Sequence, residues 1–190
     1  MEKSFVQDHF YEKIDFTTTP LAIGEYENCS FLNCNLANCD LSQIAFSECS
    51  FKNCNLSLAK LTKTSIKDVT FVDCKMLGLH FENCDNFLLA FRFESCLLNL
   101  SSFYKLKIKK TTFIDSILHE VDFTETDLTN SVFDGCDLMR AIFDNTILEK
   151  VDFRTSFNYC IDPEQNRIKK ARFSLAGVAG LLNKYEIDIS

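Results

Sequence analysis

The sequence predicts an all-β protein that coils from short extended segments, and three observations support this class. Large apolar residues occupy every fifth position from Phe31 to Phe81 and again from Phe93 to Phe153. The residue two positions before each of them is mostly small or β-branched, and the remaining three are mostly polar. A period of five matches neither an α-helix nor a β-strand. Such pieces can stack into a coil in which each backbone pairs with the coils above and below.

The length of one coil follows from a second periodicity, of twenty residues. Allowing for a two-residue slip within "NCDNFLLAFRF", steps of twenty meet only phenylalanine: Phe31, Phe51, Phe71, Phe93, Phe113, Phe133 and Phe153. The neighbouring register contains no aromatic residue: Leu36, Leu56, Met76, Leu98, Leu118 and Leu138. Four segments per coil would therefore stack like on like, with coils about 4.8 Å apart.

The ten cysteines fit the small inward position of this repeat. They are spaced by five and by twenty residues, and five of them fall in one expected column: Cys34, Cys54, Cys74, Cys96 and Cys136. Zinc sites use closer pairs such as CxxC, so we expect no metal site. Free cysteine behaves as a small buried hydrophobe, and packing is the interpretation we favour.

Two parts of the chain are expected. Residues 1–160 form the coil, with clear repeats at 26–155 and the phase slip at 82–92, which we interpret as a bulge or kink. Residues 161–190 form a C-terminal segment with an α-helix at about 174–185, N-capped by Ser174. Its apolar residues recur at helical spacing and predict a cap over the open end of the coil, a dimer interface, or both. The candidate interface residues are Leu175, Val178, Leu181, Leu182 and Ile187.

Composition narrows the function classes. The formal net charge of −7 argues against direct binding to nucleic acid or to an anionic membrane surface. No apolar stretch reaches 18 residues and the N-terminus does not have the pattern of a signal peptide, so we expect a cytoplasmic protein with reduced thiols.

Catalytic motifs are missing from the sequence. The three histidines, His9, His80 and His119, do not lie in a recognisable nucleophile motif. The sequence contains neither a glycine-rich phosphate loop nor GxSxG. We therefore predict a protein that is not an enzyme and has no cofactor.

The repeat motifs carry a family resemblance. "CNLAN", "CDLSQ", "VDFTE" and "TDLTN" resemble the pentapeptide-repeat proteins, and the likeness extends over residues 26–155. It implies a right-handed quadrilateral parallel β-helix. The tail, with Ile161-Asp162-Pro163 and Ala179-Gly180-Leu181-Leu182, resembles the microcin B17 immunity protein and the quinolone-resistance (Qnr) group. That resemblance implies a C-terminal homodimer that binds DNA gyrase or topoisomerase IV as an acidic mimic of DNA.

The charge pattern bears on mimicry. Between Asp115 and Asp152 ten acids face only Arg140 and Lys150, whereas residues 61–114 hold five acids and eight bases. The candidate partner-binding residues are Asp115, Glu120, Asp122, Glu125, Asp127, Asp134, Asp137, Asp144 and Glu149. The alternative is that the repeat simply prefers Asp and Asn at its outward positions.

Two functions remain open. The first is an interaction protein that regulates gyrase or topoisomerase IV, or protects it from quinolones or peptide toxins. The second is a structural or scaffolding rod with an unrelated protein partner. The slip adds only two residues, so the chain resembles the relatives that lack long loops, and the quinolone-protection variant of the first function is the less supported one.

Overall fold

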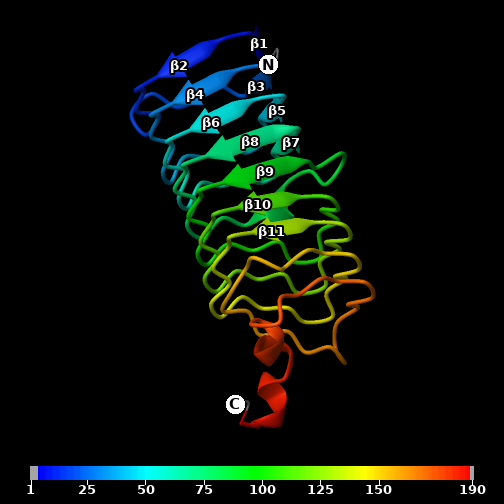
Figure 1. Ribbon diagram of the computed structural model, residues 1–190. Helices are drawn as coiled ribbons and strands as arrows, with labels where there is room; N and C mark the ends of the chain where they lie inside the picture. The colour runs from blue at the N-terminus through cyan, green and yellow to red at the C-terminus, as the bar shows by residue number, and fades with distance from the viewer. Residues whose placement is uncertain (1–3, 189–190) are drawn as a thin grey trace.

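The chain winds as a right-handed quadrilateral β-helix, seen in a computed structural model that describes residues 4–188 (Figure 1). Parallel strands pair at an offset of twenty residues, as where Phe31 lies beside Phe51. One coil therefore takes twenty residues, and the expected all-β class is confirmed. No helix of the described chain is both long and apolar enough to cross a membrane.

The described strands form two parallel sheets. One has the order β11-β10-β9-β8-β6-β4-β2 and the other β1-β3-β5-β7. Elsewhere the coils are joined by isolated parallel bridges, such as that between Ile117 and Asp137. The strands are β1 Ser4–Gln7, β2 Phe10–Glu12, β3 Gly24–Glu27, β4 Ser30–Leu32, β5 Ala45–Ser47, β6 Ser50–Lys52, β7 Ser65–Lys67, β8 Val69–Val72, β9 Phe91–Glu94, β10 Thr112–Ile114 and β11 Val132–Asp134.

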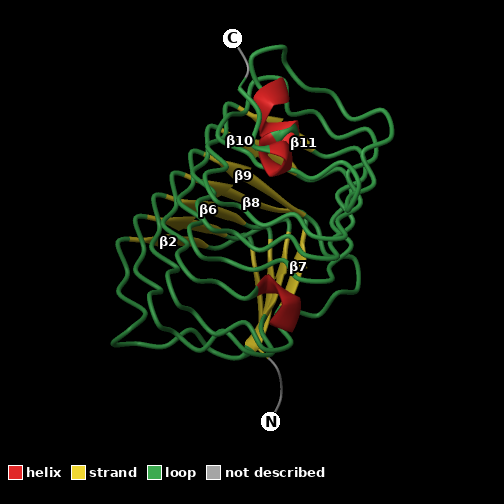
Figure 2. Cartoon of the chain, turned by 90° about the horizontal axis from the view of Figure 1, so that it is seen from below, coloured by secondary structure: helices red, strands yellow, loops and turns green. Residues whose placement is uncertain are grey.

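Each coil has four faces of five residues (Figure 2). The first face carries the seven-stranded sheet and includes 111–115 and 131–135. The second face follows along the chain with 116–120 and 136–140, and the third with 121–125 and 141–145. The fourth includes 106–110, 126–130, 146–150 and 166–170, and towards the N-terminus it carries the four-stranded sheet. The second and fourth faces lie on opposite sides of the rod, as do the first and third.

The corners between faces use a left-handed backbone. The last residue of most five-residue segments has φ between 46° and 64°, and nearly all of these residues are not glycine. Asn, Asp, Lys and Glu dominate, and none of the positive-φ residues in the described chain is β-branched. Only Gly78 and Gly135 use glycine there, so the coil needs few glycines.

Stacked rings fill the interior behind the first face. The expected phenylalanine column is confirmed, and it extends one coil further at each end, to Tyr11 and to Phe173. Adjacent rings lie 4.5–5.5 Å apart between centroids and 5–17° from parallel. A second column behind the third face stacks in the same way and was not predicted: Phe81, Phe103, Phe123 and Phe143.

The small inward positions hold hydrogen-bond donors. Thr126 Oγ1 donates to the carbonyl of Phe103 at 2.8 Å, and Cys54 Sγ lies 3.3 Å from the carbonyl of Phe31. In both pairs the acceptor lies twenty-three residues earlier, in the preceding coil. All ten cysteines are free thiols, and most are buried.

The phase slip lies on the fourth face. The 3-10 helix η1 (Phe81–Asn83) leads into it, Cys84 is buried, and the chain then bulges outwards before β9. The ladder resumes with Val69 beside Phe91, an offset of twenty-two. The bulge expected at 82–92 is thus present.

The C-terminal end differs from the sequence expectation in two ways. The parallel bridges continue to Arg172, so the coil extends past residue 160. The expected α-helix is wrong: the segment forms the two 3-10 helices η2 (Val178–Leu181) and η3 (Asn183–Tyr185). The physical reason is that the segment packs on Tyr159. Ile161 donates a backbone hydrogen bond to the carbonyl of Gly180, and this bond holds the turn against the last coil.

Candidate interaction surfaces

The nine candidate carboxylates do not share one face. The first face has Asp115 and Asp134, the second Glu120 and Asp137, the third Asp122, Glu125 and Asp144, and the fourth Asp127 and Glu149. Residues consecutive in sequence pass round the coil, so an acidic stretch of sequence becomes an acidic ring. The structure therefore brings together only the three carboxylates of the third face.

Cations pair with several of these carboxylates. Glu149 accepts from Arg167 at 2.6 Å, Asp127 lies 3.1 Å from Lys109, and Glu125 lies 3.4 Å from Lys105. These distances join side-chain nitrogen and oxygen atoms. These cations belong to neighbouring coils and lie outside the acidic stretch of sequence. Pairing of this kind weakens the negative field that the sequence count suggested.

Asp137 is held by two neighbouring side chains. Its Oδ2 lies 2.8 Å from Nε2 of His119, and its Oδ1 accepts from the amide of Asn158 at 2.8 Å. Partial burial opposes ionisation, but these hydrogen bonds outweigh it and hold the pKa of Asp137 below its usual value.

An apolar strip on the second face was missed by the sequence analysis. One bridged column there exposes Leu97 (39%) and Ile117 (36%) on consecutive coils and, beyond Asp137 in the next coil, Phe157 (49%). Met139 (41%) and Leu100 (62%) lie beside this column. The repeat usually places polar residues at these outward positions. The signal was available one residue before Leu98 and Leu118, where Leu97 and Ile117 replace the common Asn or Asp.

Two open grooves border this strip. One, of about 390 Å³, lies at the corner with the third face and is lined by Leu100, Tyr104, Glu120 and Asp122 among others. The other, of about 660 Å³, separates the last coil from the tail and includes Met139, Phe157 and Cys160. Apolar side chains next to carboxylates form a surface suited to a protein partner.

The five candidate interface residues of the tail are not equivalent. Leu181 is half-buried against the core, and Leu182 is also partly covered. Leu175 is 93% exposed, Ile187 is 56% exposed, and Val178 is 37% exposed. The tail thus both covers the last coil and presents apolar side chains outwards.

The interior offers no space for a substrate. The cavity among the stacked side chains measures about 10 Å³, which is at the lower limit for a single water molecule and too small for a substrate. Within residues 4–188, no group of three or more His, Cys, Asp and Glu side chains is arranged to hold a metal ion.

Comparison with known protein families identifies the repeat. The family described as "Pentapeptide repeat region" matches residues 25–92 and 88–157. The chain belongs to the pentapeptide-repeat family. Among solved structures of this family, two trypsin-treated forms of QnrB1, a plasmid-mediated fluoroquinolone resistance protein, resemble the chain. One has a TM-score of 0.63 and 15% identity, covering 98% of this chain and 100% of that one.

The second form gives a TM-score of 0.66 at 15% identity and covers 98% of this chain and 92% of that one. At this identity the likeness establishes the shared fold of two pentapeptide-repeat proteins. A search among curated protein sequences finds no match.

Proposed function

We propose that this pentapeptide-repeat protein is a non-enzymatic interaction protein that binds DNA gyrase or topoisomerase IV. The apolar strip on the second face is the observation that carries the proposal. Five large apolar side chains are exposed there where the repeat normally places polar ones. Exposed apolar patches of this kind mark protein interfaces. A type II topoisomerase is the partner implied by the likeness to quinolone-resistance proteins.

The acidic part of the contact is confined to the third face. Asp122, Glu125 and Asp144 lie beside the apolar strip, and Glu120 stands at the corner between the two faces. In this proposal they take the place of DNA phosphates at the edge of an apolar contact. The other five candidate carboxylates are not required. Asp115 and Asp134 lie on the first face and Asp127 and Glu149 on the fourth, while Asp137 is bonded to His119 and Asn158.

The biological effect we propose is regulation of the topoisomerase or its protection from a quinolone or a peptide toxin. The cytoplasm is the compartment in which such a partner is met. The tail would add a homodimer contact through the exposed Leu175, Val178 and Ile187.

Gyrase supercoiling, titrated with the purified protein with and without a quinolone, tests the function. Ile117→Ser should weaken the effect on gyrase at least tenfold. The matched control is Val132→Ser, because Val132 is also 36% exposed but lies on the first face. Equal loss in both variants, or no effect of the native protein at large excess, would contradict the proposal.

The charge component has its own pair of variants. Asp122→Asn with Asp144→Asn should reduce gyrase binding and its sensitivity to salt, since screening weakens exposed charges. Asp115→Asn with Asp134→Asn, on the first face, should leave both unchanged. If neither face matters to gyrase while Ile117→Ser abolishes binding to another protein, the scaffold function is the correct one.

A further inference from the structure

One corner of the rod carries a self-complementary row of side chains. We call it the ridge: it separates the fourth face from the first and takes one residue from each coil. All its members have a left-handed backbone, and all except Leu88 occupy the same corner position of their coils. In the coil of the slip the ladder pairs Val69 with Phe91, which places Ala90 at the corner and Leu88 in the bulge just before it. From the N-terminal end the members of the ridge are Asp8, Asn28, Glu48, Asp68, Leu88, Lys110, Asn130, Lys150 and Lys170.

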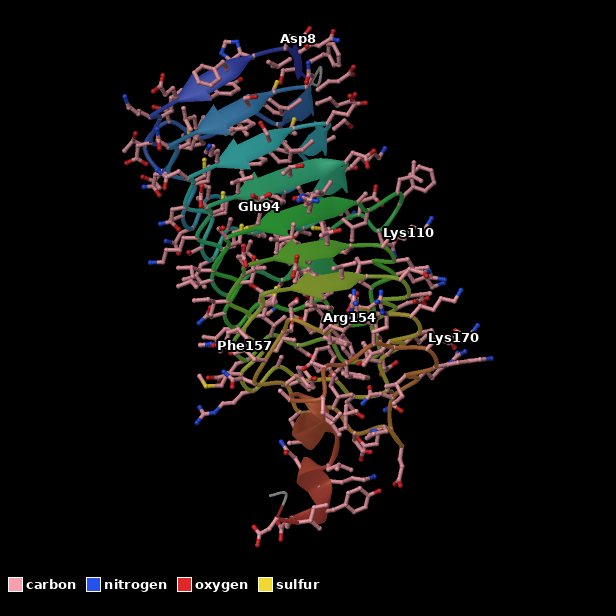
Figure 3. All side chains as sticks on the ribbon, viewed as in Figure 1. Asp8, Glu94, Lys110, Arg154, Phe157 and Lys170 are labelled. Atoms are coloured by element: carbon pink, nitrogen blue, oxygen red, sulfur yellow. The ribbon has the colours of Figure 1, made fainter. Side chains whose placement is uncertain are left out.

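The two halves of the ridge carry opposite charges. Three acids precede Leu88 and three lysines follow it, with one asparagine in each half. A reversal of the ridge about Leu88 places Asp68 opposite Lys110 and Asp8 opposite Lys170. Figure 3 shows Asp8 at the N-terminal end of the rod and Lys110 and Lys170 along its right-hand edge.

These charges are not used within the chain. Among the described residues, Lys110, Lys150 and Lys170 form no ion pair, and neither do Asp8, Glu48 and Asp68. Asp8 accepts a hydrogen bond from its neutral neighbour Asn28 at 2.6 Å.

The centre of the ridge is apolar. Leu88 and Phe87, at the tip of the slip bulge, are each 65% exposed. Asp85 Oδ1 accepts from the backbone N–H of Phe87 at 3.0 Å and shapes this turn. Beside the bulge lies an open groove of about 410 Å³, lined by Asp68, Ala90, Arg92 and Lys110 among others. A projecting apolar tip and a groove thus stand side by side at the midpoint.

We propose that the ridge binds the ridge of a second copy of this chain, antiparallel, about a two-fold axis at Leu88. An isologous contact requires a surface that is complementary to itself after a half-turn. The ridge meets this condition at its apolar centre and at the pairs Asp68–Lys110 and Asp8–Lys170. The two remaining pairs, Glu48–Asn130 and Asn28–Lys150, join a charge to a neutral amide and bring no like charges together. A parallel arrangement would set lysine against lysine, and a nucleic acid would meet repulsion from the acidic half.

The contact is weak and sensitive to salt. Exposed ion pairs contribute less than about 1 kcal/mol each, so the apolar centre and several pairs act together. Association should weaken as salt rises, because exposed charges are screened over about 8 Å at physiological ionic strength.

Zero-length carbodiimide cross-linking of the full-length protein tests the arrangement. Asp8 and Lys170 are eight coils apart, so within one chain they are separated by about 38 Å. A bond between them can form only between two copies. A mixture of ¹⁴N- and ¹⁵N-labelled protein should give the mixed-mass Asp8–Lys170 peptide. Its absence at concentrations where the ridge dimer is present would overturn the proposal.

Charge exchange provides the second test. Lys170→Glu and Asp8→Lys should each raise the dissociation constant of the ridge dimer about tenfold, and the double variant should return it to within about threefold. Lys63→Glu and Asp73→Lys are the controls, since both are exposed corner residues with left-handed backbone on other corners. If the double variant fails to recover, or if Lys170→Glu instead lowers affinity for a duplex DNA probe, the proposal is wrong.

This contact is separate from the tail dimer in the proposed function. If both form, light scattering should detect tetramers or longer assemblies, since two different two-fold axes link rods in series. Lys170→Glu would then leave the tail dimer intact, and Leu175→Asp would leave the ridge dimer intact.

Discussion

At the scale of the residue, the small inward position links one coil to the next. Its side chain must be short, because the backbone of the preceding coil lies directly behind it. Thr146 donates to the carbonyl of Phe123 at 2.8 Å, and Ser156 donates to that of Phe133 at the same distance. Each such buried bond contributes roughly 1 kcal/mol. Cysteine fits because its thiol is small, apolar and a weak donor.

The thiols should therefore differ sharply in reactivity. Burial raises the pKa of Cys49 to about 11 and of Cys136 to about 12. A raised pKa leaves little thiolate at pH 8, and thiolate is the reactive form. Cys160 is exposed. A disulfide reagent such as dithionitrobenzoate should modify Cys160 quickly and the half-buried Cys39 more slowly. The other thiols should react only on unfolding.

The control for this experiment is Cys160→Ser. That variant should lose the fast phase. In denaturant it should show one reactive thiol fewer than the native protein. A native protein in which several thiols react at the rate of Cys160 would contradict the buried column.

Size at the small position could be predicted from the sequence, whereas its hydrogen bonds could not. Cys74, Thr126 and Val121 all fit a small slot by volume, so the pattern indicated packing alone. The acceptor lies twenty-three residues earlier and becomes a neighbour only when the coil closes. The stacked phenylalanines were predictable because a ring repeated every twenty residues has few other places to go.

At the scale of the element, the corner sets the limits of the fold. A left-handed backbone costs a residue with a Cβ roughly 1–2 kcal/mol, least for Asn and Asp and most for β-branched side chains. The fold distributes this cost over many coils and offsets it with inter-coil hydrogen bonds. That explains how a chain whose coil turns at every fifth residue contains only five glycines.

Asn130 offers a direct measure of this cost. It has φ of 61°, is exposed, and lies between coils of regular geometry. Asn130→Val should lower the free energy of unfolding by about 1–2 kcal/mol, because valine disfavours this conformation. Asn130→Gly should be tolerated to within about 0.5 kcal/mol. Denaturant unfolding followed by circular dichroism measures both, and equal stability of the two variants would exclude corner strain as the cause.

The tail shows where sequence periodicity misleads. Leu175, Val178, Leu181 and Leu182 have helical spacing, yet the chain turns more tightly there because two glycines meet Tyr159. A Cβ at Gly180 would lie 2.3 Å from the backbone oxygen of Tyr159, and one at Gly177 would lie 2.0 Å from the Tyr159 hydroxyl oxygen. Contact with the last coil decides the local structure, and this contact is not visible in an apolar pattern.

Gly180→Ala should therefore loosen the cap. The added methyl group meets backbone, which cannot move aside, so we expect a loss of about 1–3 kcal/mol from overpacking. Thermal unfolding should shift to lower temperature, and hydrogen exchange at Ile161, which bonds to the Gly180 carbonyl at 3.0 Å, should become faster. Ala176→Ser, at an exposed neighbouring position, is the matched control. Unchanged exchange at Ile161 would show that the tail does not hold the last coil.

At the scale of the whole molecule, the coil sorts charges by face. The net charge of −7 averages over four surfaces that a partner never meets together. On the fourth face, residues 106–110, 126–130, 146–150 and 166–170 hold seven bases and two acids, although the third face beside it is acidic there. Counting charges along the sequence could locate the acidic stretch but not its face, because that requires knowing which residue lies at each corner.

The same reasoning changes the test of the tail dimer. Leu181 is half-buried against the core, so Leu181→Asp would disturb the cap and lower the stability of the rod whether or not a dimer exists. Leu175 is 93% exposed and supports nothing within the chain. Leu175→Asp should therefore halve the mass measured by light scattering without changing the melting temperature, because a charge in a shared apolar contact is costly only to the dimer. The comparison is made in the Lys170→Glu background, with and without Leu175→Asp, so that the ridge dimer does not contribute to the mass. An unchanged mass for Leu175→Asp in that background would exclude the tail as the dimer interface and leave capping as its role.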